Sequence, residues 1–364
     1  MSGELTKLES TGSVFENDDN TLRRLQLTGG LGDFTAANAL TMYGLNHMKM
    51  PLPTSGNKDS QGYVFFTRPD LNLSYHNLAQ DRQFALMINN PNDSVWGYVR
   101  AVLAGRGAKD YPSPFVNPNN PFIPILTNNL KNLSGWSEVT VDPQTSDAGI
   151  YNEAHSMADG FSKDYSVKNL NATFSNQIGD PLNKLFTTWT RYSMMVKEGV
   201  MDPYLEYLIM NIIDYNTRIY VFVMDPTKRF IQNIAATGAA FPLNSQLAAK
   251  FDYDKEKPLK DYSDDISIQF QCMGMIYDDP ILMAEFNTLV DAFCPMISQG
   301  KYKKLTGEEV KAHNMLGIPR INTETGQLDW YVSPNNYMGK LDVGDSKRDN
   351  GSLANQNYNQ SIRF

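Results

Sequence analysis

The fold class is decided by one stretch of the sequence, Ile266-Ser267-Ile268-Gln269-Phe270-Gln271-Cys272-Met273. Apolar residues occupy every second position, and a period of two is typical of a strand with one buried face. Cys272 lies on the apolar side, where an unpaired cysteine acts as a small hydrophobic residue. We therefore predict a regular β-strand at 266–273.

Other segments outside this stretch also have strand character. Residues 218–224 are apolar on both faces, which predicts a central or sandwiched strand. Leu170, Ala172 and Phe174 alternate with polar residues, as in a half-buried strand. Weaker strand patterns are expected at residues 63–66, 71–75, 135–141 and 230–236. The chain is therefore predicted to be mainly β.

The strongest helix signal lies between Asp180 and Gly199. Asp180 suits the N-terminal cap, Pro181 the first helical position and Gly199 the end. Apolar residues at spacings of three and four then form one stripe: Leu182, Leu185, Phe186, Trp189, Tyr192, Met195 and Val196. This pattern predicts an amphipathic helix that packs on the sheet.

Further helices are predicted with less regular patterns. They are expected at residues 34–43 and 81–90, after Pro203 with Leu205, Leu208, Ile209 and Ile212, after Pro280, and within 301–319. Asp278 and Asp279 are interpreted as caps that complement the dipole of the helix after Pro280. Prolines crowd residues 111–124, which predicts an extended surface loop. Regular patterns fade after Cys294, and the chain from Gly339 onward is expected to be a flexible arm.

The composition suits a protein with a large core. The chain has 364 residues, of which 41% are hydrophobic, so one or two domains are expected. Charged residues make up only 20%, while Tyr and Phe number 19 and 18. Interface cores are rich in aromatic residues and poor in charge, so either an aromatic core or extensive contact with partners explains these numbers. Composition alone leaves both interpretations open.

The net charge of −8 argues against tight nucleic-acid binding, because it provides no basic surface for phosphates. It remains compatible with an acidic channel wall that DNA passes without sticking. The first twenty residues are polar and acidic, and no apolar run approaches the roughly 20 residues of a membrane helix. Neither a signal peptide nor a membrane span is expected.

Residues able to carry chemistry are scattered. The two cysteines, Cys272 and Cys294, form no motif, and the four histidines have no metal-ligand spacing. Acidic residues gather between 252 and 265 and suit a hard cation, but the EF-hand spacing and its glycine are missing, which favours a solvated loop. Local signatures of hydrolases, kinases and oxidoreductases are also missing. We therefore expect no catalytic residue, no cofactor and no metal.

Residues 171–278 resemble the tail-tube proteins of contractile-tailed phages and the baseplate relatives that initiate the tube. The resemblance rests on elements in that family's order: residues 68–73 as the opening strand, the helix around Trp189, residues 218–228 as a strand and hairpin, the turn at 236–242, residues 251–254, and a last strand at 266–277. It implies an α+β, mainly β fold, an antiparallel β-sandwich or barrel with a packed flanking helix. The expected parts are an N-terminal extension at 1–61, the tail-tube-like β domain at 62–293 with a Pro-rich insertion, and a partly flexible C-terminal extension at 294–364.

The resemblance also implies a structural role rather than catalysis. Copies are expected to form a hexameric ring in the virion, either of the tail tube or of the tube-initiating layer of the baseplate. Assembly is expected in the host cytoplasm. The other expected partners are neighbouring tube, baseplate hub or sheath proteins, with tape measure protein and DNA in the lumen without specific binding. Residues 218–224 and 266–276 are expected to form the sheet shared between copies, with Leu185, Trp189 and Tyr192 anchoring the helix on it.

Alternative functions remain. Another virion ring, such as a tail terminator or neck protein, fits the same residues. A virion-associated cell-wall hydrolase with acidic catalytic residues is a hypothesis from a different class, and a carbohydrate-binding module rests only on the aromatic, Asn-rich composition. The oligomeric mass and a cell-wall lysis assay discriminate among them.

Overall fold

The computed structural model describes residues 45, 47–49, 59–161, 166–251, 255–256, 265–313 and 316–337. The predicted helix at 34–43 and most of the acidic stretch between 252 and 265 lie outside the described residues. So does the predicted flexible arm beyond Gly339.

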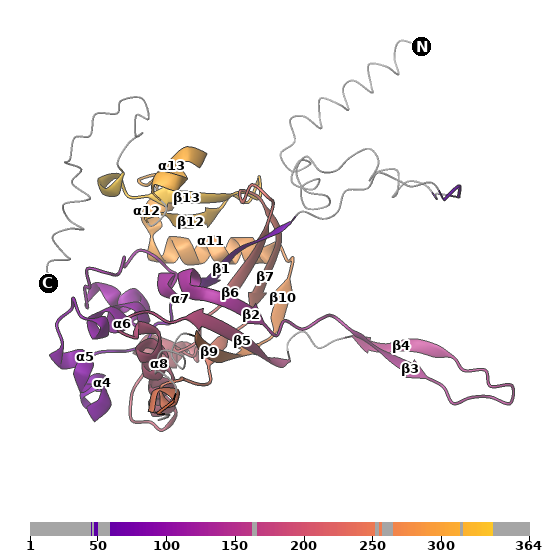
Figure 1. Cartoon of the computed structure of the whole chain (residues 1–364), viewed down its shortest axis with the longest axis horizontal. Coiled ribbons are helices and arrows are strands. Elements are labelled where there is room, and N and C mark those ends of the chain that lie inside the picture. Colours follow the sequence, from indigo (N-terminus) through magenta and orange to yellow (C-terminus); the bar gives the residue numbers. More distant parts are fainter. Residues whose placement is uncertain are drawn as a thin grey trace, which may run out of the picture.

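Two four-stranded antiparallel sheets form the centre of the molecule (Figure 1). The first contains, in spatial order, β1 (Ser60–Phe66), β6 (Ile219–Met224), β7 (Ile231–Thr237) and β10 (Met275–Tyr277). The second contains β2 (Leu130–Ser134), β5 (Val167–Ser175), β9 (Asp265–Met273) and β8 (Ala240–Pro242). The predicted α+β, mainly β class is therefore confirmed.

The two sheets are halves of one sheet folded at a glycine corner. Met275 pairs with Thr237 in the first half and Cys272 with Ala240 in the second. Each pair is three residues from the other along both strands, so the register continues unbroken through the corner. The Gly238 N–H donates to the Gly274 carbonyl there (3.0 Å), and Gly274 has a φ of +78° that favours glycine. β7 with β8, and β9 with β10, are thus two bent strands that pass from one half to the other.

Helix α8 (Pro181–Lys197) packs on the half that contains β9. The apolar side of β9 is buried as its alternation predicted, and the Phe186 ring lies 6.0 Å from Phe270 and 5.6 Å from Phe174. The anchoring side chains expected for this helix, Leu185, Trp189 and Tyr192, are all buried in the same cluster. The strand at 218–224 lies in the first half, and of residues 266–276 only β10 joins it there, so the two expected strands are linked through β7 and are not direct neighbours.

Two predicted caps differ from the structure. Asp180 has a φ of +58°, and its Oδ1 accepts a hydrogen bond from the side chain of Asn183 rather than from a helix N–H. Asp279 does accept the N–H of Ile281 (3.0 Å) at the start of α11 (Ile281–Phe293). Asp278 instead accepts from β7, because its φ of +49° turns the side chain toward that strand.

Helix α11 covers the outer face of the first half. Its Phe286 ring lies 5.6 Å from Phe65 and 5.2 Å from Phe222, so α11 buries the face of β6 that carries Tyr220, Phe222 and Met224. β6 is central in its half, as predicted, but Val221 and Val223 on its other face are only partly buried. A small sheet lies against the other side of α11 and contains β11 (Lys303–Lys304), β13 (Leu328–Val332) and β12 (Ile318–Ile321).

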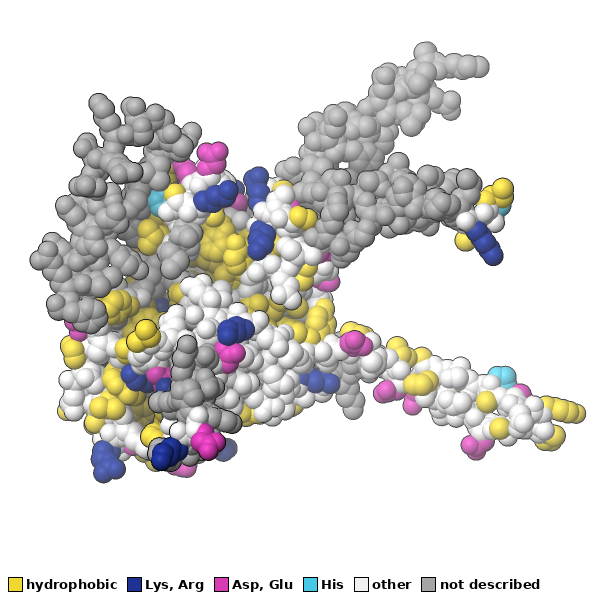
Figure 2. Space-filling view, viewed as in Figure 1, with side chains coloured by type: hydrophobic (Ala, Val, Ile, Leu, Met, Phe, Trp, Pro, Cys, Tyr) yellow, Lys and Arg dark blue, Asp and Glu magenta, His cyan; other side chains and the backbone are white. Residues whose placement is uncertain are grey.

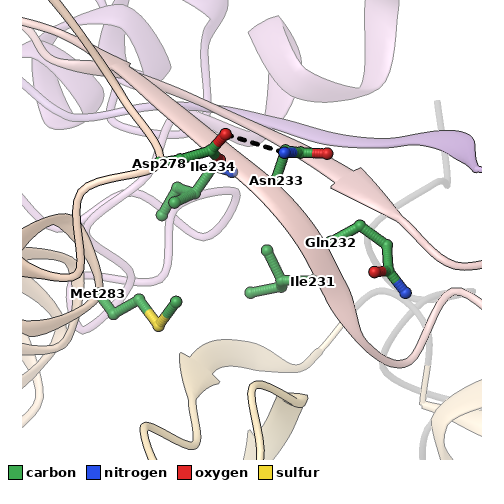
Figure 3. A pocket seen from close by; sticks show the side chains of 6 residues that line it. All are labelled: Ile231, Gln232, Asn233, Ile234, Asp278 and Met283. Atoms are coloured by element: carbon green, nitrogen blue, oxygen red, sulfur yellow. Dashed lines mark hydrogen bonds between the residues drawn. The ribbon is translucent and has the colours of Figure 1, made fainter. Parts of the chain in front are cut away.

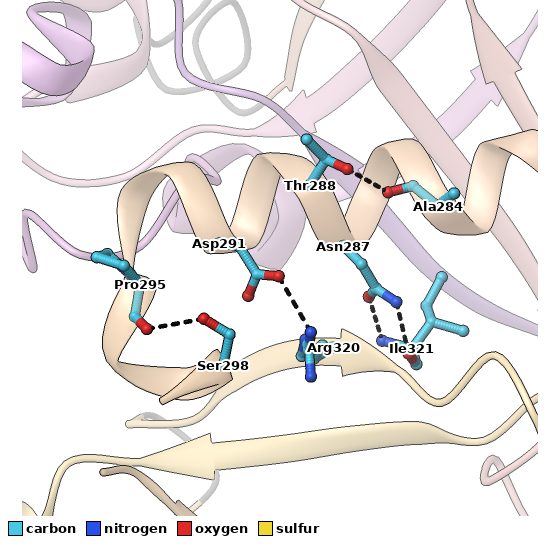
Figure 4. A network of polar contacts seen from close by, with 8 residues as sticks. All are labelled: Ala284, Asn287, Thr288, Asp291, Pro295, Ser298, Arg320 and Ile321. Atoms are coloured by element: carbon cyan, nitrogen blue, oxygen red, sulfur yellow. Dashed lines mark hydrogen bonds and ion pairs between the residues drawn. The ribbon is translucent and has the colours of Figure 1, made fainter. Parts of the chain in front are cut away.

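The side chain of Asn287 on α11 covers the free edge of β12 (Figure 4). Its amide donates to the Ile321 carbonyl (2.7 Å) and accepts the Ile321 N–H (2.9 Å), as a neighbouring strand would. The Arg320–Asp291 ion pair (3.0 Å) lies beside it. The expected loss of regular structure after Cys294 is therefore wrong for the described residues. The boundary drawn at 293/294 stays a prediction.

Short helices surround this centre. They are α4 (Tyr75–Ala79), α5 (Ala85–Asn89), α6 (Val95–Leu103), α7 (Pro124–Asn129), α9 (Leu205–Met210), α12 (Pro295–Ser298) and α13 (Gly307–Ala312), with 3-10 turns at Arg82–Phe84, Gly105–Lys109, Ala248–Phe251 and Pro334–Asn336. The helices expected at 81–90, after Pro203 and within 301–319 are thus present. The predictions of strands at 71–75 and 135–141 are wrong. Leu71 and Leu73 are buried but lie in the coil that leads into α4, and β3 begins only at Val141.

Candidate assembly surfaces

Away from the glycine corner, the described part of the sheet ends in two free edges, while the short strands β10 and β8 are the outermost strands beside the corner. β1 is the outermost strand of the first half and β2 that of the second. Only the end of β1 is covered, where the Phe66 carbonyl accepts the Ile123 N–H (2.9 Å). An edge strand presents unpaired N–H and C=O groups, which another chain can pair with. The edges therefore belong to β1 and β2, whereas β6 and β9, expected from the sequence to be the shared strands, lie inside the sheet.

The second half exposes a polar face without charge at its centre. Residues of β5 and β9 that point away from the core are Asn169, Asn171, Thr173, Ser267, Gln269 and Gln271. They form cross-strand pairs such as Asn171 with Gln269 and Asn169 with Gln271. Lys131 and Asp265, which form an ion pair with each other, stand at one end. Amides and hydroxyls on this face remain hydrated and hold no phosphate-binding cation.

A long hairpin of β3 (Val141–Thr145) and β4 (Ser156–Phe161) projects from the body (Figure 1). Every residue from 138 to 160 is exposed, including Ile150 and Tyr151 at the tip, which are at least 90% exposed. Figure 2 shows hydrophobic and acidic side chains along it. Residues 138–161 contain five acids and no Lys or Arg. The sequence analysis missed this hairpin, although that charge pattern together with Val139 and Val141 was visible in the sequence.

Two hollows adjoin helix α11. The wider, of about 480 Å³, is lined among others by Thr67, Arg218 and Glu285, and the last two form an ion pair (2.7 Å). The narrower, of about 170 Å³, lies between β7 and the start of α11 (Figure 3). Its carboxylate, Asp278, already accepts from Asn233 Nδ2 (2.8 Å) and the Ile234 N–H (2.9 Å). This volume is below the roughly 300 Å³ at which ligand pockets begin. At this hollow the Asp278 carboxylate therefore links β7 to the turn before α11 by two hydrogen bonds.

Two titratable groups of the described core, Cys272 and Tyr192, have their pKa raised by burial. Burial raises the pKa of the Cys272 thiol to about 12, so it stays protonated and unreactive at neutral pH. Burial, and then the Asp214 carboxylate, raise the pKa of Tyr192, whose hydroxyl donates to that carboxylate (2.5 Å). Within the described residues, no three His, Cys, Asp or Glu side chains come together as a metal site would require. None of the described helices is long and apolar enough to cross a bilayer.

A protein family described as "putative phage tail tube protein" matches residues 4–345. The chain belongs to this family. The chain is accordingly a tail-associated structural component of the virion. The resemblance stated from residues 171–278 is therefore confirmed.

No curated protein matches this chain in sequence. A solved structure of the anti-feeding prophage tube-terminating cap is similar over 44% of this chain and 84% of its own, at 10% identity and a TM-score of 0.26. The sheath/tube terminator of an extracellular contractile injection system, PVC, is similar over 41% of this chain and 85% of its own, at 10% identity and a TM-score of 0.22. Similarity at this level carries no argument about the fold, and the fold described above rests on the pairing of the strands.

Proposed function

We propose that copies of this chain form a closed ring of the phage tail tube, or of the tube-initiating layer of the baseplate, by pairing β1 of one copy with β2 of the next. The observation that supports this most is the sheet with two unlike free edges. Pairing of two different edges is a head-to-tail contact, which closes into a ring when the rotation between copies allows it. Closure removes every exposed sheet edge. A sixfold ring and stacking into a tube are parts of the same proposal.

The uncharged polar face of β5 and β9 is our candidate for the lumen wall. Its side chains are amides and hydroxyls, such as Asn171, Gln269 and Gln271. The only cation that the described residues place beside this surface is Lys131 at one end, where it is paired with Asp265, so passing phosphates gain little binding energy there. The tape measure protein and DNA are proposed to pass without specific contacts. The acids that give the net charge of −8 are not required on this wall.

The extensions are proposed to contact other tail components. Residues 1–61 and 294–364 flank the β domain at 62–293, as the sequence analysis expected. Their neighbours would be adjacent tube rings, the baseplate hub or sheath proteins, with assembly in the host cytoplasm. A ring that binds other tail components in this way has a structural role rather than a catalytic one. A tail terminator or neck ring remains the second candidate, and imaging separates it because such a ring does not extend into a tube.

The test is the assembly state of the purified chain and of a variant at the β2 edge. Lys131 lies at a bulge, since the pairing with β5 passes from Leu130 to Asn132. Leu130 has φ −68° and ψ 122°, the conformation that a residue before proline prefers. Lys131→Pro therefore places in the edge strand a residue that cannot donate a ladder hydrogen bond, while Lys131→Ala loses the same ion pair and keeps the backbone N–H.

We expect wild type and Lys131→Ala to form rings with a central hole by electron microscopy, and Lys131→Pro to remain a monomer by native mass spectrometry. Circular dichroism checks that all three fold. Rings formed equally well by Lys131→Pro would contradict pairing through β2. A wild-type chain that stays a monomer at tens of micromolar would overturn the ring.

A further inference from the structure

Helix α9 and the residues after it expose an apolar ridge, which we define as Leu205, Leu208, Ile209, Met210, Ile212 and Ile213. No residue of α9 is buried, and Leu205 and Ile209 are 70% and 72% exposed. Together the six side chains expose roughly 350 Å² of apolar surface, if each exposes about 100 Å² when free. Contiguous patches of a few hundred Å² on a soluble protein mark interaction sites.

Polar contacts hold the ridge in this orientation. The Tyr207 hydroxyl donates to Asp70 Oδ2 (2.6 Å) and accepts from Arg106 Nη2 (2.6 Å), so the polar side of α9 faces the body. Arg106 also pairs with Asp70 (3.1 Å). Burial, and then the hydrogen bond to Asp70, raise the pKa of Tyr207 to about 12, so the hydroxyl stays protonated. Because these hydrogen bonds hold the polar side of α9 against the body, its aliphatic side chains point outward.

The hairpin of β3 and β4 is the second apolar feature without a cover. A two-stranded hairpin is at best marginally stable alone in water. Its strands pair from Val141 with Phe161 to Thr145 with Ser156, and the ladder continues through the Gly149 N–H to the Glu153 carbonyl (2.8 Å). Ten residues from Val141 to Ile150 at about 3.3 Å each place the tip roughly 30 Å from its base. The tip thus reaches a neighbouring copy.

Charge decides which surface of a neighbour the tip meets. The hairpin carries acids at 138, 142, 147, 153 and 159 and no cation, so two hairpin tips repel each other. The ridge has a single acid, Glu206, and the half-exposed Arg106 guanidinium stands at its margin, 5.9 Å from the Tyr207 ring. An acidic, apolar tip therefore fits the ridge better than it fits another tip.

We infer that the ridge of one copy is the seat for the hairpin tip, Ile150 and Tyr151, of a second copy. The contact is head-to-tail, because ridge and tip are different surfaces of the same chain. It rests on the proposed assembly into rings and adds to it a contact separate from the sheet edges.

The test is a cross-link between two single-cysteine variants of the full chain. Tyr151→Cys and Ile209→Cys are mixed and oxidised, because a disulfide forms only when the two Cα atoms come within about 7 Å. The native Cys272 and Cys294 are both at most 1% exposed and do not interfere. A disulfide-linked dimer is expected in the mixture. None is expected from Tyr151→Cys alone, or from Tyr151→Cys mixed with Thr288→Cys, which is exposed elsewhere on α11.

A second measurement tests the energetic role of the ridge. Ile209→Asp should weaken assembly about tenfold in sedimentation analysis, whereas Ile178→Asp, a fully exposed apolar position outside the ridge, should not change it. If rings form but no cross-link joins positions 151 and 209, or if Ile209→Asp assembles like the wild type, the ridge is not the binding site of the tip. The proposed ring would stand in that case. A cross-link between two Tyr151→Cys tips would also contradict binding of the tip at the ridge. Absence of any assembly in the wild type overturns both proposals.

Discussion

Gly238 lies at the corner where the sheet folds into two halves, and a single added methyl group tests that corner. A Cβ at this position would stand 1.8 Å from the Met273 carbonyl oxygen and 3.0 Å from its carbon. Both are backbone atoms of the neighbouring bent strand, so no side-chain rotation relieves the contact. Gly238→Ala must therefore push the two strands apart.

The cost follows from what the strands lose. Separating them weakens the hydrogen bonds from Gly238 N–H to Gly274 O (3.0 Å) and from Met273 N–H to Ala239 O (2.9 Å). Each contributes about 1 kcal/mol net. Overpacking at a rigid site adds about 1–3 kcal/mol. We expect Gly238→Ala to lower the free energy of unfolding by about 3–5 kcal/mol in total.

Urea unfolding followed by tryptophan fluorescence measures this change, since Trp189 is fully buried on the sheet. The matched control is Gly307→Ala at the start of α13, where an added Cβ meets no atom within 4 Å. Glycine to alanine at such a site is neutral or stabilises by about 0.4–1 kcal/mol. If Gly238→Ala came within about 0.5 kcal/mol of the wild type, the range of ordinary surface changes, the corner would not be where the fold is fixed.

Three further predictions concern buried polar contacts. Arg68, 6% exposed, donates to the Val102 carbonyl (3.0 Å), so Arg68→Met should destabilise by about 3 kcal/mol in urea, by leaving that acceptor unpaired; an unchanged midpoint would contradict this. Asn287→Leu exposes the β12 edge and should speed hydrogen exchange at Ile321, whereas Thr288→Leu should not. The Tyr337 hydroxyl, then Thr306, lower the pKa of Glu309 from 4.5 to about 2. The stability that the Glu309 carboxylate contributes is therefore full above pH 4.5 and is lost as pH falls toward 2. In acid titrations followed by circular dichroism, Glu309→Gln should be less stable than the wild type at neutral pH and should lose less stability between pH 4.5 and 2. Wild-type and variant curves that run parallel would count against this.

Periodic segments were predictable because their pattern reports the environment directly. The alternation at 266–273 and the stripe around Trp189 each match a buried face in the structure. The apolar run at 218–224 forms a central strand, and α11 supplies the core that buries its Tyr220, Phe222 and Met224. In each case the burial of side chains follows from the spacing of apolar residues along a regular backbone.

Segments in which burial does not follow a period were mispredicted. Leu71 and Leu73 alternate with polar neighbours, yet the Leu71 N–H donates to the Leu103 carbonyl at the end of α6 rather than to a strand. Residues 318–321 and 328–332 are too short to show a pattern, and form strands because α11 gives them a surface and Asn287 pairs with their edge.

The sequence by itself determined the mainly β class, the helix on the sheet and the family, because periodicity and the order of elements are properties of the chain. Only the tertiary structure decided that the sheet folds at Gly238 and Gly274, and that within the described residues β1 and β2 lie at its edges while the hairpin and the ridge stay exposed. Strand order depends on pairing between residues far apart in the chain, and exposure depends on what else packs nearby. Neither is encoded in local spacing.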